Sequence, residues 1–459
     1  MTSRKPALLI TTLIGLTASR GLPSETAAIT GATVIDPASG RVQSSVTVVV
    51  EGNRIKSVQP ATAALPGGTR RIHGEGKYLI PGLWDAHVHL TKLGVGSLPL
   101  FIANGVTSVR DMGSDLSEVA EWRRRILAGA LTGPRIKTSG QILESRANVD
   151  RMNRERGVEP LERIRIGIAN AEEGRAAVAN LVSRGADHIK MRTTSGEDTL
   201  EAVALECARR KIPFTAHPLA PLADLIRLRL GSVEHLGALH PIGLADEERR
   251  ALFTSMAKEN AFMSTTLANV YGSILVPYDE AKRRLEDVRG KIDPRRKYVC
   301  GYLMEDWREQ VEEKKDSPYA EFEKELPGLL GDLRGMRESS VQFLAGTDAA
   351  VALMYPGFSL HDELENLVNK IGFRPMEALR VATYNPAAFY GEQDRYGAVA
   401  PGQTADLVLL DADPLVNIGN TRKIGGVMLQ GRWLDGNAIR KLLRDAERRA
   451  AGDCWVKGQ

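Results

Sequence analysis

Short apolar runs that suit β-strands alternate along most of this chain with longer amphipathic stretches that suit helices. Several of these runs end in a histidine, a lysine or an aspartate. The expected strands are Leu83 to His89, Val106 to Asp111, Arg135 to Ser139, Asp187 to Arg192, Pro213 to His217, Ser232 to His235, Phe262 to Thr265 and Gln342 to Asp348. This alternation predicts a (β/α)8 barrel, in which functional side chains gather at the carboxyl ends of the strands.

Both ends of the chain have a different pattern, in which short β-branched runs are separated by turn residues. We expect residues 29–80 and 396–436 to build one small β-sandwich domain beside a barrel of residues 81–395. Residues 437–459 are expected to form a C-terminal helix or tail. One barrel connection, about 266–341, is too long for a simple helix and predicts a helical insertion. Such an insertion can cover the barrel mouth or project into solvent, and the sequence favours neither arrangement.

The first 28 residues have the pattern of a signal peptide. Arg4 and Lys5 precede an apolar run from Ala7 to Ala18, which is shorter than the ~20 residues that a membrane span requires. Small residues allow cleavage either near Ser19 or near Ala28. We therefore expect a secreted or periplasmic protein that has no membrane association after cleavage.

The composition is that of a soluble enzyme with more than one domain, because the 459 residues are 43% hydrophobic and 26% charged. The net charge of +4 arises from intermixed signs. Even the densest basic run, Arg123 to Arg125, lies beside Glu118 and Glu121 in a helix-like segment. This pattern is typical of a solvated helix face, so we expect no nucleic-acid partner.

The first expected barrel strand ends in a pair of histidines. His87 and His89 are two residues apart, so the strand periodicity places both side chains on one side. Such a pair can bind one cation, although two histidines on one strand face are often only hydrogen-bonded. The polar residues at the ends of the other strands give this pair its significance.

Lys190 lies inside an apolar strand, where an unpaired ammonium group is costly to bury. An ammonium group cannot ligate a metal ion. Carbamylation by CO₂ would convert the same side chain into an anionic carboxylate that can bridge two cations. The alternative is a lysine paired with a neighbouring acid, and the residues alone favour it.

Three further strands end in His217, His235 and Asp348. Imidazole groups at two strand ends suit a second metal ion, and a carboxylate at the last strand can hydrogen-bond a metal-bound water. Singly, each histidine is more often a core residue whose hydrogen bonds are satisfied. Six such side chains at strand ends are hard to attribute to packing.

Four sequence motifs, together with the Lys190, His217 and His235 strands, are similar to those of a known family. They are Ile80 to His89, Leu344 to Asp348, Ala382 to Ala387, and Pro401 to Val408. With these motifs the chain resembles the amidohydrolase superfamily, in particular its imidazolonepropionase-like and Xaa-Pro-dipeptidase-like branch. The resemblance covers nearly everything after the predicted signal.

The resemblance implies a site with two divalent metal ions, preferably zinc. In such a site His87 and His89 bind the more buried ion, and His217 and His235 bind the more exposed one. Lys190 is implied to be N6-carboxylysine, a CO₂-derived carbamate that bridges both ions.

Asp348 is implied to be both a metal ligand and the general base of the reaction. A metal-activated hydroxide would attack the substrate carbonyl, and Asp348 would pass its proton to the leaving nitrogen.

Arg192 shares a strand face with Lys190 and lies nearer the barrel mouth, so it is a candidate clamp for a substrate carboxylate. Pairing of Arg192 with Glu197 or Asp198 in the following loop remains open as an alternative.

Arg110, at the end of the second strand, and Tyr271, after the seventh, are further substrate-binding candidates. His73, His240 and His361 have no partner at ligand spacing, and we expect them to be structural or exposed.

Three functional hypotheses follow, and in the first two the protein acts on a small-molecule or short-peptide substrate. The leading one is hydrolysis of an amide bond in a dipeptide or an N-acyl amino acid that has a free carboxylate. The second is hydrolysis of a cyclic amide, carbamate, urea, lactone or organophosphate, because one fold supports many chemistries. The third is a non-catalytic scaffold, which the complete ligand set argues against. A homo-oligomer is compatible with each hypothesis.

Overall fold

The computed structural model describes residues 26–156, 161–236, 244–316 and 319–452. Most of the predicted signal segment, residues 1–25, therefore lies outside the described residues. Its last three residues, 26–28, belong to the first strand of the fold, β1 (Thr26–Asp36).

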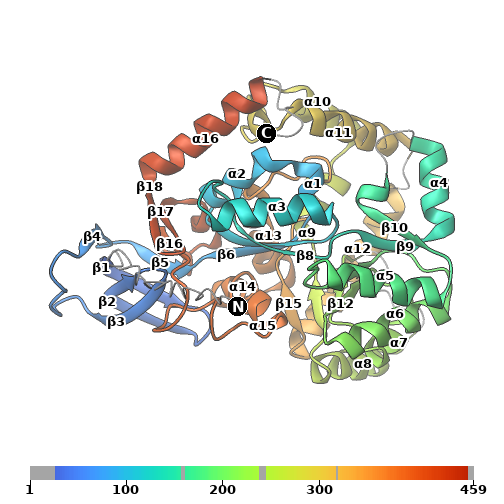
Figure 1. The fold of residues 1–459 in the computed structure, drawn as a ribbon, viewed down its shortest axis with the longest axis horizontal. Helices are drawn as coiled ribbons and strands as arrows, with labels where there is room; N and C mark the ends of the chain where they lie inside the picture. Colours follow the sequence, from blue (N-terminus) through green and yellow to red (C-terminus); the bar gives the residue numbers. More distant parts are fainter. Residues whose placement is uncertain (1–25, 157–160, 237–243, 317–318, 453–459) are drawn as a thin grey trace, which may run out of the picture.

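Ten short parallel strands build the larger part of the molecule (Figure 1). They form a three-stranded sheet in the order β6–β7–β8 and a seven-stranded sheet in the order β10–β9–β11–β12–β13–β14–β15. Their bounds are β6 (Leu83–Val88), β7 (Val106–Asp111), β8 (Arg135–Thr138), β9 (Ile142–Ser145), β10 (Arg165–Ile168), β11 (Ile189–Met191), β12 (Phe214–Ala216), β13 (Ser232–Glu234), β14 (Phe262–Ser264) and β15 (Gln342–Leu344).

Backbone hydrogen bonds join the two sheets at both seams. The Asp348 amide donates to the His87 carbonyl over 2.8 Å, which joins the end of β15 to β6. The Asp187 amide donates to the Thr138 carbonyl over 2.8 Å, which joins β11 to β8. The eight predicted strands therefore surround one interior, and the predicted (β/α)8 barrel is confirmed.

Two strands that the sequence analysis did not predict, β9 and β10, extend the seven-stranded sheet beyond the ring. They pair with each other in parallel, and Leu143 of β9 pairs with Met191 at the end of β11. Because β9 begins only four residues after β8 ends, its apolar run was included in the connection. These strands bring Glu144 and Arg165 to the barrel mouth.

Helices cover the outside of the barrel, and their sequences explain where they begin and end. In α5 (Ala171–Ser183) the Asn170 side chain accepts hydrogen bonds from the amides of Glu172 and Glu173. The remaining helices of this part of the molecule are α1 (Leu90–Leu93), α2 (Leu98–Ala103), α3 (Leu116–Leu127), α4 (Arg146–Arg156), α6 (Glu197–Arg210), α7 (Leu222–Arg227), α8 (Asp246–Lys258), α12 (Tyr319–Glu338), α13 (Phe358–Asn366), α14 (Pro375–Val381) and α15 (Tyr384–Phe389). None of the helices in the described part of the chain is long and apolar enough to span a membrane.

Strands from both chain ends form one eight-stranded sheet beside the barrel, at the left of Figure 1. Its order is β18–β17–β16–β5–β1–β2–β3, and β4 pairs with β1. The bounds are β2 (Arg41–Glu51), β3 (Arg54–Pro60), β4 (Arg70–His73), β5 (Tyr78–Pro81), β16 (Leu407–Leu410), β17 (Ile424–Leu429) and β18 (Arg432–Asp435). Ile29, Val48 and Leu407 belong to the apolar core of this sheet, which is separate from the barrel core. The last helix, α16 (Gly436–Ala451), packs against α2 of the barrel.

The long connection after β14 is helical, and part of it lies on the loops at the barrel mouth. Before α12, its helical segments include α9 (Leu267–Asn269), the π-helical turn Val270–Ile274, α10 (Tyr278–Glu286) and α11 (Gly301–Glu313). Trp307 of α11 is fully buried, and its Nε1 donates to the Ala350 carbonyl over 3.0 Å. Tyr302 Oη donates to the Thr91 carbonyl over 2.7 Å. Of the two arrangements left open by the sequence, the structure has the one in which the insertion contacts the mouth.

Candidate active site

The six side chains expected to bind metal line one cavity of about 310 Å³ at the carboxyl ends of the barrel strands. Lys92 and Arg165, with Gln310 and Glu313 from α11, also line this cavity. The structure therefore brings together residues that are separated by up to 261 positions, as the strand-end pattern predicted.

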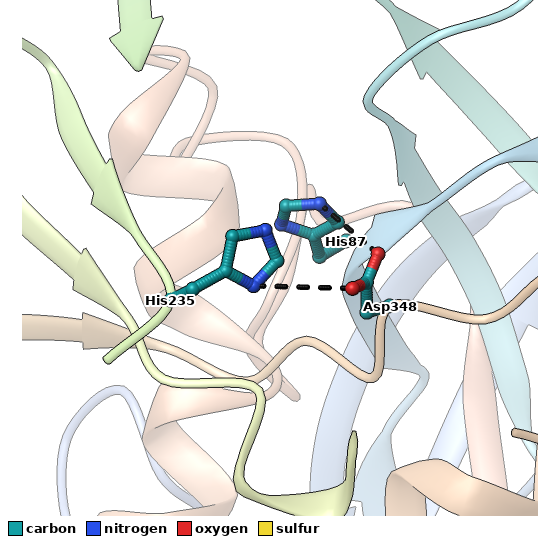
Figure 2. Close-up of side chains that lie close together, drawn as sticks. All are labelled: His87, His235 and Asp348. Carbon is teal, nitrogen blue, oxygen red and sulfur yellow. Dashed lines mark ion pairs between the residues drawn. The ribbon is translucent and has the colours of Figure 1, made fainter. Parts of the chain in front are cut away.

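Asp348 is the centre of the cluster, because three imidazole groups face its carboxylate. Its Oδ1 lies 3.2 Å from His89 Nε2 and 3.5 Å from His87 Nε2, and its Oδ2 lies 3.9 Å from His235 Nδ1. Figure 2 shows His87 and His235 next to each other, both directed toward this carboxylate. Ligand atoms of these two histidines and Asp348 all lie within 4.8 Å of one another, a geometry that can hold a metal ion.

A glycine allows Asp348 to come this close to the first strand. A Cβ atom on Gly346 would lie 2.6 Å from the Cβ of His87, which is closer than packed atoms can approach. The buried carboxylate of Asp85 then links the two strands, because it accepts hydrogen bonds from the amide and hydroxyl of Thr347 over 3.0 and 2.6 Å. The Leu344 to Asp348 motif is thus needed for the geometry of the site.

Glu234, which the sequence analysis did not single out, orients His87. It is fully buried, and its Oε2 lies 2.8 Å from His87 Nδ1. This contact directs the opposite ring atom, Nε2, toward Asp348, and Nε2 has no hydrogen-bond partner in the described structure. A carboxylate behind a ligating histidine is a common feature of metal sites. The available signal was an acid on a barrel strand directly before His235.

Arg110 does not lie in the cavity, contrary to the expectation that it contacts substrate. It is 1% exposed, and its guanidinium donates to Ser232 Oγ and to both oxygens of Glu234 over 2.8 to 2.9 Å. A buried glutamate requires such a counter-charge. Arg110 therefore holds Glu234 in place beneath the site and is not a clamp at the mouth.

The protonation states of the cluster suit metal binding. Burial lowers the pKa of His87 to about 3 and that of His235 to about 4, so both imidazoles are neutral at pH 7. Burial also lowers the pKa of His217, whose ring centroid lies 4.8 Å from that of His235. For Asp348 burial acts to raise the pKa, but the neighbouring histidines outweigh it and keep the carboxylate ionised.

Lys190 is 1% exposed, and its Nζ has no hydrogen-bond partner among the described residues. The pairing with a neighbouring acid that the sequence favoured is therefore not made. Burial lowers the pKa of Lys190 to about 7. This buried amine, which loses its proton far more readily than an ordinary lysine, lies beside four imidazoles and one carboxylate, and these groups fit divalent metal ions.

The mouth of the cavity carries an arginine pair around a buried acid. Arg192 Nη1 donates to Glu144 Oε1 over 3.2 Å, and Arg165 forms an ion pair with the same oxygen. Glu144 of β9, and neither Glu197 nor Asp198, is thus the partner of Arg192. Because β9 and β10 were not predicted, sequence reasoning missed Glu144 and Arg165.

Tyr271 does not line the cavity, and its ring packs 4.7 Å from Lys370 Nζ. Of the histidines that were expected to be structural or exposed, two lie in the described residues and agree with that expectation. His361 is buried with Nδ1 2.9 Å from Thr421 Oγ1, and His73 lies on the surface 3.7 Å from Glu75. His240 lies outside the described residues.

The family model of the amidohydrolase family matches residues 78–434, which is most of the chain. The chain belongs to the amidohydrolase family. This finding confirms the resemblance and makes the protein a hydrolase that acts on amide bonds. An ochratoxinase from Aspergillus niger is 24% identical over 394 residues, which cover 74% of this amidohydrolase and 71% of the relative.

Solved structures of amidohydrolases share this fold. A proposed prolidase from Bifidobacterium longum superposes with a TM-score of 0.69 at 24% identity and covers 93% of this chain and 100% of its own. A bottromycin amidohydrolase superposes with a TM-score of 0.71 at 20% identity and covers 95% of this chain and 93% of its own. At such identities the likeness establishes the fold and does not carry over a substrate.

Proposed function

We propose that this amidohydrolase is a binuclear metal-dependent enzyme that cleaves an amide bond beside a free carboxylate, in a dipeptide or an N-acyl amino acid. The observation that carries the proposal is the convergence of His87, His89, Lys190, His217, His235 and Asp348 on one cavity. The orphaned Nε2 of His87 and Nζ of Lys190 support it, because buried polar atoms without partners are rare unless a ligand satisfies them.

His87, His89 and Asp348 would hold one metal ion, His217 and His235 the other, and Lys190, carboxylated on Nζ, would bridge them. Zinc or a similar divalent ion bound there would supply Lewis-acid activation of water and of the substrate carbonyl.

Asp348 then acts as the general base. Its ionised carboxylate takes a proton from the attacking water and delivers it to the leaving nitrogen. Glu234 and Arg110 keep His87 in the orientation that this geometry needs.

The charge at the mouth supports a substrate with a carboxylate. Arg165 and Arg192 both pair with the carboxylate of Glu144, so two guanidinium groups lie together at this side of the cavity. Arg192 is one-third exposed and is placed to turn a guanidinium edge toward a bound carboxylate. The solved relatives described as prolidase and as Xaa-Pro dipeptidase act on dipeptides by their names, which fits this substrate class.

The test is a panel of dipeptides and N-acyl amino acids, each paired with its C-terminal amide, incubated with the zinc-loaded enzyme. We expect amino-acid release from the free acids and at least about tenfold less from the amides, measured by mass spectrometry. Release from both forms alike would contradict the carboxylate preference. If the enzyme hydrolysed none of these compounds but did hydrolyse cyclic amides, carbamates or esters, the proposed substrate class would be wrong.

A further inference from the structure

Two side chains outside the cavity contact the site from one short segment. This segment, Thr266 to Asn269, begins two residues after the end of β14 and starts the helical insertion. Asn269 Nδ2 donates to Asp348 Oδ2 over 3.1 Å. Thr266 Oγ1 lies 2.9 Å from His235 Nδ1. Neither residue lines the cavity, so each can act only through the side chain that it contacts.

The hydrogen bond to Asp348 is the feature that accounts for a buried amide at position 269. Asn269 is 7% exposed, and its Oδ1 has no hydrogen-bond partner in the described structure. A buried amide with an unmade hydrogen bond is costly, and a leucine of similar size would fill the same space without that cost. The bond to Asp348 Oδ2 leaves Oδ1 of the carboxylate to face His87 and His89. Asn269 therefore fixes the rotation of the carboxylate that the proposed reaction uses.

Thr266, which contacts His235, has an unfavourable backbone conformation. Its φ is 47°, in the left-handed region that β-branched residues rarely adopt. Buried Glu363 of α13 holds the turn in this conformation, because it contacts Thr265 Oγ1 and accepts from the Ala268 amide over 2.6 Å. A strained residue that the surrounding structure holds in place is typical of a functional site.

We propose that Asn269 and Thr266 are positioning residues that fix Asp348 and His235 from outside the cavity. The inference rests on the proposed roles of Asp348 and His235 and adds residues that set their geometry. It assigns a function to the start of the insertion, which serves the site through hydrogen bonds and not through substrate contact.

For Asn269 the test compares Asn269→Leu with a matched control. Asn385 is also buried, its Nδ2 donates to the Phe343 carbonyl over 2.9 Å, and its Oδ1 also lacks a partner in the described structure. We expect Asn269→Leu to lower kcat about 10- to 100-fold with KM changed less than about threefold. Asn385→Leu should lower the melting temperature and leave kcat within about twofold. Equal effects of the two substitutions on kcat would overturn the role of Asn269.

For Thr266 the test measures zinc affinity by competition with a chelator, which needs no substrate. Thr266→Val keeps the shape and removes the hydroxyl, whereas Thr266→Ser keeps the hydroxyl. We expect affinity to weaken about 10- to 100-fold in the valine variant and to stay within about threefold in the serine variant. Equal affinities in both variants would overturn the role of Thr266. If wild-type enzyme proved inactive on the dipeptide panel and the valine variant still lost zinc, only the proposed substrate would fail.

Discussion

Asp348 and its neighbours illustrate how single residues acquire function from their surroundings. The carboxylate is nearly buried, which alone would favour the protonated form, yet three imidazoles keep it ionised. Burial lowers the pKa of His87 and of His235, so these two imidazoles are neutral at pH 7 and able to bind metal. The candidate ligands could be predicted from sequence because each ends a strand, whereas their supporting partners could not.

Replacement of Asp348 by asparagine tests its role as the base. The asparagine side chain would keep the shape and one ligand oxygen, but it cannot accept a proton at neutral pH. We expect Asp348→Asn to retain at least one zinc ion per chain and to lower kcat about 10²- to 10⁴-fold. Steady-state kinetics and elemental analysis of the same sample check both expectations. A near-normal rate in the metal-loaded variant would rule out Asp348 as the general base.

A second prediction at the scale of single residues concerns Arg192. Of the two arginines that pair with Glu144, Arg192 has the more exposed side chain. We expect Arg192→Met to raise KM for free-acid substrates about 10- to 100-fold and to leave C-terminal amides nearly unaffected. Arg146→Met serves as the control, because Arg146 forms an exposed pair with Glu173. An equal change in KM for acids and amides would remove Arg192 from substrate binding.

At the scale of elements, the regular alternation of strands and helices made the barrel predictable from the sequence. The additional strands β9 and β10 interrupt this alternation and were not predicted. The strands that were predicted are separated by long amphipathic segments, whereas β9 follows β8 almost at once. Its register came from pairing with β11, a tertiary contact that no local pattern encodes. Glu144 and Arg165 were missed for this reason, and Arg110 was misplaced because strand alternation does not show which arginine is buried against an acid.

The helix α13 supports the turn after β14 through Glu363, and this contact predicts a pH dependence of stability. Burial raises the pKa of Glu363 to about 8, so the folded protein holds it neutral where the unfolded chain, near its usual 4.5, is ionised. Between these values the folded state binds more protons. Glu363 therefore contributes a stability that is complete below about pH 4.5 and is lost as the pH rises through about 8.

The variant Glu363→Gln isolates this effect, because it keeps a side chain of the same shape that cannot ionise and can still accept from the Ala268 amide beside Thr265. We expect the unfolding free energy of the wild type to fall relative to the variant by up to about 1.4 kcal/mol per pH unit between pH 5 and 8. Urea denaturation at several pH values measures the difference. Parallel pH curves for the two proteins would contradict a neutral Glu363.

At the scale of the whole molecule, the two ends of the chain depend on each other. β1 and β5 from the N-terminal part share a sheet with β16 and β17 from the C-terminal part. The sequence indicated this arrangement through similar β-rich patterns at both ends. The order of the strands in this sheet depends on pairing between the two ends of the chain. This order could not be predicted from the sequence of either end alone.

This arrangement restricts where the predicted signal peptide can be removed. Ala27 and Ala28 are buried in β1 and pair with Val50 and Val49 of β2. We propose that the protein is exported, and we expect cleavage before Thr26, such as near Ser19, because later cleavage removes strand residues. Intact-mass measurement of the exported protein identifies the new N-terminus. A folded mature chain that begins after Ala28 would contradict this expectation.

The claim that the whole molecule serves a binuclear metal site is tested most directly by zinc titration. Metal-free enzyme in bicarbonate buffer is titrated with zinc while hydrolysis of a free-acid dipeptide or N-acyl amino acid is followed, and Lys190→Ala is treated in parallel. We predict that the rate rises to a maximum at two zinc ions per wild-type chain and that the variant binds fewer ions and stays at least about tenfold slower. Full activity without metal, or a maximum at two ions that does not need Lys190, would contradict the account.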